Sequence, residues 1–351
     1  MGKAWRLVTI SVGLALAIGF GVTPRSQGRL SRAVGASMPP RLTDRELWQL
    51  SVDASEPNGY FRSDNLTSNE LGFERVIPEL LTRTRPGAAY LGVGPEQNFT
   101  YMAAVRPAVA IIFDIRRGNL QLQLMYKAIF ELTHDRADFV SMLFSRPRPR
   151  GLSTETSVAD LFATFGATGN DEALYERNLA AINERLLKFH ALPLPPADVD
   201  GIKHIYRVFF ERGAAIRYSP SYAELMAAND DAGVSRSYLA TESNFSVVRD
   251  LEIGNLVVPV VGDFAGPKAI RRIGAYLKTH GIPIGAFYLS NVEQYLQDGK
   301  WTAFCRNVAT LPLDASSTFI RSTSGRGSTF GPGFVSSLGS MTAETKDCSA
   351  P

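Results

Sequence analysis

The sequence predicts an α/β fold in which a mostly parallel sheet is flanked by helices. Three features lead to this prediction. An apolar run over Ala88–Gly94, a helical segment and a second apolar run over Val109–Asp114 have the order of a βαβ unit. Two further apolar runs, Asn255–Gly262 and Ile282–Leu289, follow later in the chain. All four runs are continuously apolar, which is typical of strands covered on both faces, so the sheet is expected to be Rossmann-like.

The helices are predicted from apolar spacing and capping residues. The first covers Leu42–Val52, with Thr43 or Asp44 at its N-cap. The other helices are expected over Leu71–Leu81, Thr100–Val105, Leu120–Leu132, Ala137–Phe144, Asp171–Phe189, Pro267–Lys278 and Asn291–Leu296. Beyond the helices, a last strand is expected over Thr318–Arg321, at an edge of the sheet.

The chain of 351 residues is expected to form one large α/β domain over residues 41–322. A mainly helical insertion is predicted over about residues 150–253. The tail over 323–351 is rich in Ser, Gly and Thr, and it is predicted to be disordered, as is the linker over 23–40.

The N-terminus has the pattern of a signal peptide or a membrane anchor. Lys3 and Arg6 precede Leu7–Val22, an apolar run without charge. The run is short for a membrane span, so export with cleavage and retention as an anchor both stay open. A misassigned start codon before a cytoplasmic protein is the alternative. In an oxidising compartment Cys305 and Cys348 could pair, although the sequence does not establish the geometry.

Composition and motifs exclude several function classes. The formal net charge is +3, and no stretch interleaves aromatic with basic residues, so a nucleic-acid partner is not expected. No C-x-x-C or H-E-x-x-H spacing indicates a metal site. The sequence lacks a G-x-S-x-G motif, which disfavours a nucleophilic hydrolase. The oligomeric state is not predicted.

A candidate cofactor loop follows the first strand. Gly92 and Gly94 allow the backbone to turn tightly and a ligand to approach the peptide groups. Asp114 closes the next strand about 22 residues later, where a carboxylate can accept hydrogen bonds from ribose hydroxyls. The alternative is a tight turn with no ligand, in which Asp114 caps a loop.

The loop favours S-adenosylmethionine over a dinucleotide. Gln97 stands where the dinucleotide pattern has its third glycine, and Glu96 places a negative charge beside the N-terminus of the following helix. That charge would repel a pyrophosphate, whereas it is compatible with a sulfonium and an ammonium group.

These motifs resemble those of class I S-adenosylmethionine-dependent methyltransferases. Leu91–Glu96 and Ile112–Asp114 are similar to the first two motifs of that fold, and Val260–Asp263 looks like the fourth. Over about residues 42–322 the chain resembles an uncharacterised bacterial family of the same fold. It departs from the pattern because Glu96 replaces a loop glycine. No Asn-Pro-Pro-Tyr or Asp-Pro-Pro-Tyr motif is present, which disfavours methylation of a nucleic-acid amino group.

Polar residues at the predicted carboxyl ends of the strands complete the candidate site. Glu70 belongs to a segment that could fold over this cleft. Ser290 and Asn291 could instead cap a helix. Glu293 could instead be a charge in the first turn of a helix, favoured by the helix dipole. Asp64 and Asn65 could instead be turn residues. The predicted residues are, for the cofactor, Gly92, Val93, Gly94, Glu96, Asn98 and Asp114; for catalysis, Asp263, Tyr288 and Glu293; and for the substrate, Asp64, Asn65, Ser290 and Asn291.

Two functions follow as hypotheses. The first is an S-adenosylmethionine-dependent methyltransferase of unknown acceptor, whose rate would come mainly from aligning the nucleophile with the methyl group. The second is a non-catalytic ligand-binding or interaction protein of the cell envelope on a degenerate methyltransferase fold. Both expect a small-molecule ligand. Export argues against the first, because the cofactor is made in the cytosol.

Overall fold

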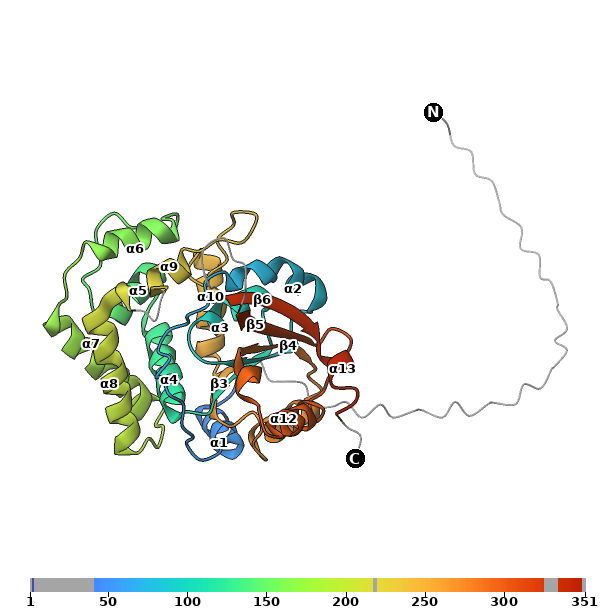
Figure 1. The fold of residues 1–351 in the computed structure, drawn as a ribbon. Helices are drawn as coiled ribbons and strands as arrows, with labels where there is room; N and C mark the ends of the chain where they lie inside the picture. The colour runs from blue at the N-terminus through green and yellow to red at the C-terminus, as the bar shows by residue number, and fades with distance from the viewer. Residues whose placement is uncertain (1, 3–40, 217–219, 325–333, 349–351) are drawn as a thin grey trace, which may run out of the picture. The chain divides into compact units, whose positions relative to one another are not determined.

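The computed structural model describes residue 2 and residues 41–216, 220–324 and 334–348 (Figure 1). The apolar run Leu7–Val22 and the linker over 23–40 lie outside these residues. Within the described ranges, no helix combines the length and apolar character needed to cross a membrane.

The core of the protein is a six-stranded sheet with the order β3-β2-β1-β4-β5-β6. The first five strands run parallel, and β6 is antiparallel to β5. This arrangement confirms the predicted α/β, mostly parallel, Rossmann-like sheet. The order reverses between β1 and β4, where such sheets bind ligands. The strands are β1 (Ala89–Val93), β2 (Val109–Asp114), β3 (Val257–Val261), β4 (Ile284–Ser290), β5 (Thr318–Ser324) and β6 (Phe334–Ser340).

The position of β3 corrects one prediction. β3 pairs only with β2 and forms an edge of the sheet, whereas β4 is the strand that pairs with β1 on its other side. The match of Val260–Asp263 to a fourth-strand motif is therefore wrong. The edge position also explains why a proline, Pro259, is tolerated in β3. A proline has no backbone N–H to donate, and an edge strand has no second neighbouring strand that would need one.

Helices cover both faces of the sheet (Figure 1). One layer contains α1 (Asp44–Ala54), α11 (Ala269–Thr279) and α12 (Lys300–Val308), and the other contains α2 (Ile77–Arg83), α3 (Gln97–Val105), α4 (Arg117–Leu132) and α10 (Glu242–Ile253). Successive β4 side chains point to opposite layers. The Phe287 ring lies 6.4 Å from that of Phe304 on α12, and the Tyr288 ring lies 5.2 Å from that of Tyr101 on α3.

The connection from β2 to β3 contains the predicted helical insertion, drawn away from β4–β6 in Figure 1. Arg136 anchors it from a buried position. Its guanidinium group donates to Glu242 and to four backbone carbonyls from two other loops. Besides α4 and α10, the connection contains α5 (Arg136–Phe144), α6 (Val158–Gly166), α7 (Glu172–Glu184), a π-helical turn η2 (Arg185–Phe189), α8 (Pro196–Arg212), η3 (Gly213–Ala215) and α9 (Tyr222–Met226).

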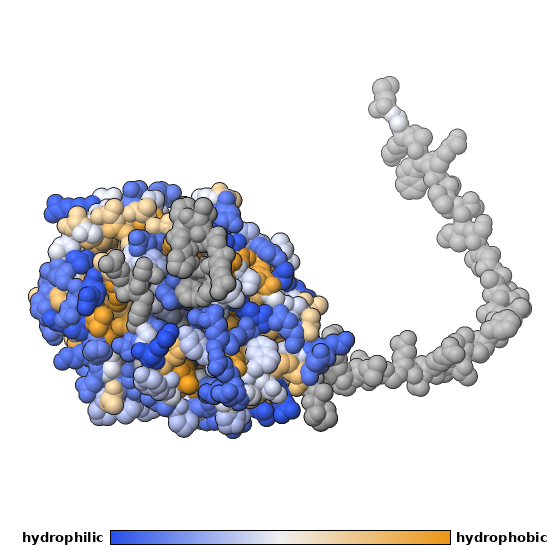
Figure 2. All heavy atoms as spheres, in the orientation of Figure 1, coloured by the Kyte–Doolittle hydropathy of each residue, from blue (hydrophilic) through white to orange (hydrophobic). Residues whose placement is uncertain are grey.

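Several element boundaries show how the local sequence acts. Thr43 caps α1 in a capping box with Glu46, as the sequence predicts. The helix predicted from Pro267 instead begins at Ala269, as α11, after a loop that contains the proline. The predicted helices Leu71–Leu81 and Asn291–Leu296 contain 3₁₀ turns, η1 (Phe73–Val76) before α2 and η4 (Val292–Tyr295). Figure 2 shows a mostly hydrophilic face with small, separated hydrophobic areas.

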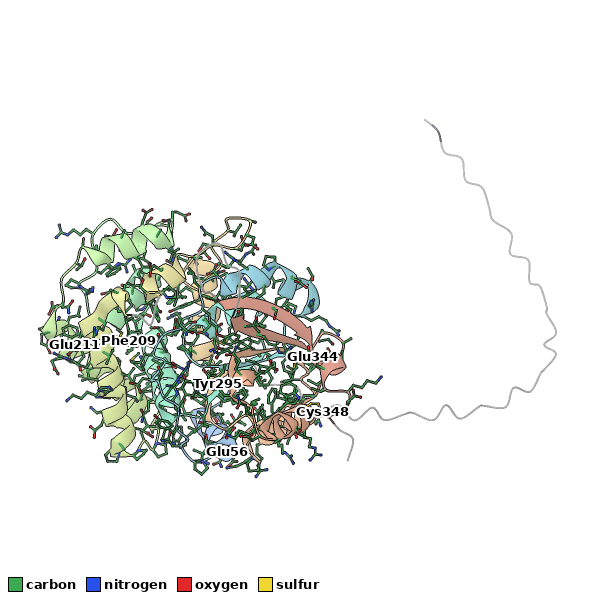
Figure 3. All side chains as sticks on the ribbon, viewed as in Figure 1. Glu56, Phe209, Glu211, Tyr295, Glu344 and Cys348 are labelled. Atoms are coloured by element: carbon green, nitrogen blue, oxygen red, sulfur yellow. A yellow bond between two sulfur atoms is a disulfide. The ribbon has the colours of Figure 1, made fainter. Side chains whose placement is uncertain are left out.

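The C-terminal segment corrects a second prediction. Residues 334–348 are not disordered, because β6 pairs with β5 along its whole length and α13 (Met341–Glu344) follows it. Thr318–Arg321 is thus part of a strand inside the sheet, and β6 is the edge. Cys348 lies beside α12 (Figure 3) and forms a disulfide with Cys305 of that helix, so these two cysteines do pair.

A buried polar cluster joins α1, α4 and α10. His190 lies between two carboxylates, 2.7 Å from Asp44 and 2.6 Å from Glu131. The ammonium group of Lys127 lies 2.7 Å from Glu131 and donates to the backbone carbonyl of Glu252. Both carboxyl oxygens of Glu252 are buried without a hydrogen-bond partner among the described residues. Burial raises the pKa of Glu252 to about 8.

The disulfide is expected to stabilise the fold, because it closes a loop between residues separated by 43 positions. Reduction, or the double substitution Cys305→Ser and Cys348→Ser, should lower the free energy of unfolding by about 2–4 kcal/mol. Urea unfolding with and without reductant measures the change. The double variant is the control, because its midpoint should not respond to reductant. An unchanged midpoint for the reduced native protein would contradict the prediction.

Stability is expected to fall as the pH rises from about 5 to about 8. The folded pKa of Glu252, about 8, lies above the ordinary value of 4.5 for a glutamate, so the folded state binds the proton more tightly. Burial has the same effect on Glu74, whose pKa is about 8. Glu252→Gln should flatten this dependence and make the protein more stable than the native chain at the alkaline end. Urea unfolding across the range tests this, and an unchanged slope in the variant would disprove it.

Candidate functional site

A segment without regular secondary structure crosses the carboxyl edge of the sheet. We call residues 55–72 the strap. Glu56, labelled in Figure 3, attaches it to the β3 end. The Glu56 carboxylate accepts hydrogen bonds from the backbone N–H groups of Asp263, Lys268 and Ala269, at 3.0, 2.7 and 2.9 Å. This contact shapes the loop after β3 and caps the first turn of α11.

The middle of the strap is attached to the β2 end. The Gly59 N–H donates to the carbonyl of Ile115 at 2.8 Å, and the Arg117 N–H donates to the Asn58 side chain at 2.7 Å. Arg116 extends its guanidinium group to the carbonyl of Asp64. The N–H of Gly59 and the carbonyl of Asp64 are thus paired with residues that follow β2.

The last part of the strap is attached to the β1, β4 and β5 ends through two buried carboxyl groups. The Ser68 N–H donates to the Glu96 carboxylate at 3.0 Å. Glu70 accepts hydrogen bonds from the hydroxyls of Tyr288, Ser290 and Ser322, the first at 2.7 Å. Burial raises the pKa of Glu70.

A pocket of about 280 Å³ lies between the strap and the sheet. It contains the carboxyl ends of four parallel strands, so residues far apart in sequence meet there. The predicted residues that line it are Asn65, Val93, Gly94, Asp114, Asp263, Ser290 and Asn291. This is the position in which open α/β sheets bind ligands.

The glycine loop is filled on its inner side and open toward the pocket. The Asn98 amide donates to the carbonyls of Val93 and Pro95, at 2.9 and 2.8 Å. A Cβ atom at Gly92 would lie 1.9 Å from the Asn98 side-chain oxygen, so this position has no room for a side chain. Gly94 has a φ of +81° and no atom within 4 Å of its Cβ position. Gly92 and Asn98 thus shape the loop without lining the pocket.

Asp114 points into the pocket but already has a partner. Its carboxylate forms a bidentate ion pair with Arg116, at 3.0 Å from Nε and 2.8 Å from Nη2, and accepts the Arg116 N–H at 2.9 Å. A carboxylate has about four lone-pair sites, so three are used. A ribose diol would have to use the remaining site or displace the guanidinium group.

Glu96 lies away from the pocket. Its side chain is fully buried, faces Ser68, and has its pKa raised by burial to about 7. The charge that was expected to repel a pyrophosphate at the helix N-terminus is therefore not presented to a ligand. The repulsion argument against a dinucleotide therefore does not apply, whereas the argument from Gln97, which stands at the position of the third glycine, is unaffected.

Two predicted catalytic residues and one predicted substrate residue also lie outside the lining of the pocket. Tyr288 is fully buried, and its hydroxyl accepts a hydrogen bond from Gln97 at 2.5 Å and donates to Glu70. Glu293 forms a bidentate ion pair with Arg321, at 2.7 and 3.0 Å. Asp64 contributes its carbonyl group to Arg116. Of the predicted catalytic residues, Asp263 alone lines the pocket.

Several lining residues were not predicted as parts of the site. Thr67 and Gln97 lie at its buried end, and Phe61, Tyr295 and Lys300 lie toward the surface. The Phe61 and Tyr295 rings form an edge contact at 5.2 Å. The position of Gln97 in the glycine loop was a usable signal, whereas η4 and the strap approach the sheet only in the folded chain. The pocket therefore combines a polar floor with an aromatic mouth.

Comparisons with known proteins give a family without an assigned activity. A search of curated proteins found no match. A family model described as "Domain of unknown function (DUF7790)" matches residues 66–343. The match includes the end of the strap and all six strands. The chain therefore belongs to the DUF7790 family.

Proposed function

We propose that this protein binds a small nucleoside-type ligand in the pocket beneath the strap, on a degenerate methyltransferase-type fold, and that S-adenosylmethionine is the candidate ligand. The observation that carries the proposal is the convergence of Gly94, Asp114 and Asp263 on one pocket. The open glycine turn lets a ligand approach the backbone, and the carboxylates at the ends of β2 and β3 can accept hydrogen bonds from its sugar and base.

Contacts within the site favour binding over methyl transfer. A general base must reach its substrate with a free lone pair. Tyr288 and Glu293 are engaged by other residues and do not line the pocket. The negative charge of Asp114 is paired with the guanidinium group of Arg116. These contacts favour ligand binding over catalysis by Tyr288, Glu293 or Asp114.

Methyl transfer is the second candidate function, and Asp263 is the residue that favours it. Its carboxylate lines the pocket, and one of its oxygens accepts the Ala265 N–H at 2.9 Å. The other oxygen could orient or deprotonate an acceptor beside a bound cofactor.

Export to the cell envelope is part of the proposal. The disulfide between Cys305 and Cys348 supports an oxidising compartment. The pattern of Lys3, Arg6 and Leu7–Val22 supports an export signal or an anchor.

Thermal unfolding with added ligands tests the proposed function. S-adenosylmethionine and S-adenosylhomocysteine should each raise the melting temperature, because a ligand at a hundred times its Kd adds about 2.7 kcal/mol of stability. NAD serves as a comparison for a ligand with a pyrophosphate. The absence of any shift with the two sulfur nucleosides would contradict the proposed ligand. Release of S-adenosylhomocysteine from S-adenosylmethionine in a cell extract would indicate methyl transfer instead.

Asp114→Asn tests whether the carboxylate contacts the ligand. If sugar hydroxyls bind there, the variant should weaken nucleoside binding about tenfold, as for loss of a charged hydrogen bond. Asp198→Asn is the matched control, because Asp198 is also buried and paired with an arginine, Arg117, but lies outside the pocket lining. Calorimetric titration of both variants provides the comparison. Equal affinities in the two variants would mean that Asp114 serves only the structure.

A further inference from the structure

The floor of the pocket contains two buried side-chain oxygens that lack hydrogen-bond partners. Thr67 and Gln97 both line the pocket and are only 2% and 3% exposed. Thr67 Oγ1 and Gln97 Oε1 are buried with no hydrogen-bond partner among the described residues. Buried polar atoms are rarely left unpaired, so a ligand group at the floor is expected to satisfy them.

The hydrogen-bond network determines which end of the Gln97 amide is free. An ionised Glu70 carboxylate can only accept, so the Tyr288 hydroxyl donates to it. The Tyr288 oxygen then accepts from the Gln97 amide nitrogen. This leaves the Gln97 carbonyl oxygen, an acceptor, as the group available to a ligand.

In its ionised form, Glu70 adds a negative charge to the same floor. Its three hydrogen-bond partners are the neutral hydroxyls of Tyr288, Ser290 and Ser322. Within the described ranges, no lysine, arginine or histidine pairs with it. By contrast, Asp114 and Glu293 each have an arginine partner. A buried carboxylate without a counter-ion is costly, so a cation at the floor would stabilise it.

We propose that this floor is a subsite for a primary ammonium group, held by Thr67 Oγ1, Gln97 Oε1 and the Glu70 carboxylate, and that the ligand is therefore an amine. An ammonium group has three N–H donors and one positive charge, which match two unpaired acceptors and one uncompensated carboxylate. A phosphate or carboxylate group would meet acceptors and a like charge. A neutral hydroxyl would leave Glu70 without a counter-charge.

The other end of the pocket indicates the rest of the ligand. Phe61 and Tyr295 lie toward the surface, and Tyr295 is 42% exposed. Aromatic side chains of this kind pack against a flat or apolar body. The ligand class is thus a small molecule with a primary amine at one end and a ring at the other. This inference refines the proposed function by adding a group that the ligand must carry.

Two matched pairs of probes separate the amine inference from the nucleoside proposal. We would titrate the full, oxidised protein near neutral pH with 5′-amino-5′-deoxyadenosine against adenosine, and with 2-phenylethylamine against 2-phenylethanol. In any pair that binds, the amine should bind about tenfold more tightly or better, as for charged hydrogen bonds.

An amine preference in both pairs supports the amine subsite and the nucleoside ligand. If adenosine binds and the amine adds nothing, the amine subsite is overturned and the proposed function stands. If 2-phenylethylamine is preferred and neither nucleoside binds, the amine subsite stands and the nucleoside ligand is overturned. Failure of all four probes to bind overturns both.

Substitutions locate the preference at the floor. Thr67→Val removes a hydroxyl that makes no hydrogen bond within the described residues, so the variant should fold and lose severalfold of the amine preference. Glu70→Gln removes the charge and should abolish the preference. Thr164→Val on α6 is the control, with the preference unchanged. If Thr67→Val folds and keeps the full preference, the subsite is overturned, even if Glu70→Gln fails to fold.

Discussion

The contact between the buried Glu70 carboxyl group and the ends of β4 and β5 is the interaction on which the site depends. The strap has no helix or strand to satisfy its own polar groups, so it can lie across the sheet only where the strand ends supply donors. Glu70 receives three hydroxyls there, and Glu56 receives three backbone N–H groups at the β3 end. These contacts fix the roof of the pocket at both ends.

The same contacts explain the chemical character of the pocket. Several polar side chains around the pocket are hydrogen-bonded to other residues of the protein, as Asp114 is to Arg116. Residues locked by such hydrogen bonds form a preorganised site, which favours binding because little order has to be gained. At the floor of the pocket, Thr67 and Gln97 keep unpaired oxygens.

The sheet could be predicted well because its strands are local patterns. Continuous apolar runs of the right length placed β1 and β2 correctly, and the Thr43 capping box started α1 as expected. Asp114 and Gly94 were predicted to meet, since both follow parallel strands. The roles of Glu96, Asn98 and Tyr288 were not predictable, because a side chain's direction depends on what packs against it from elsewhere in the chain. The composition of 323–351 suggested disorder, but β6 gains its stability from pairing with β5, a long-range contact.

The sequence by itself determined the α/β class, the glycine turn, the acidic strand ends and the presence of two cysteines. These features depend on residues that are neighbours along the chain. Only the tertiary structure decided that β3 is an edge strand and that Cys305 pairs with Cys348. It also decided that Arg116 forms an ion pair with Asp114 and that the strap covers the pocket. Each of these depends on the order in which strands pair and on the direction of buried side chains. Both are set by the packing free energy of the whole chain, which no local pattern contains.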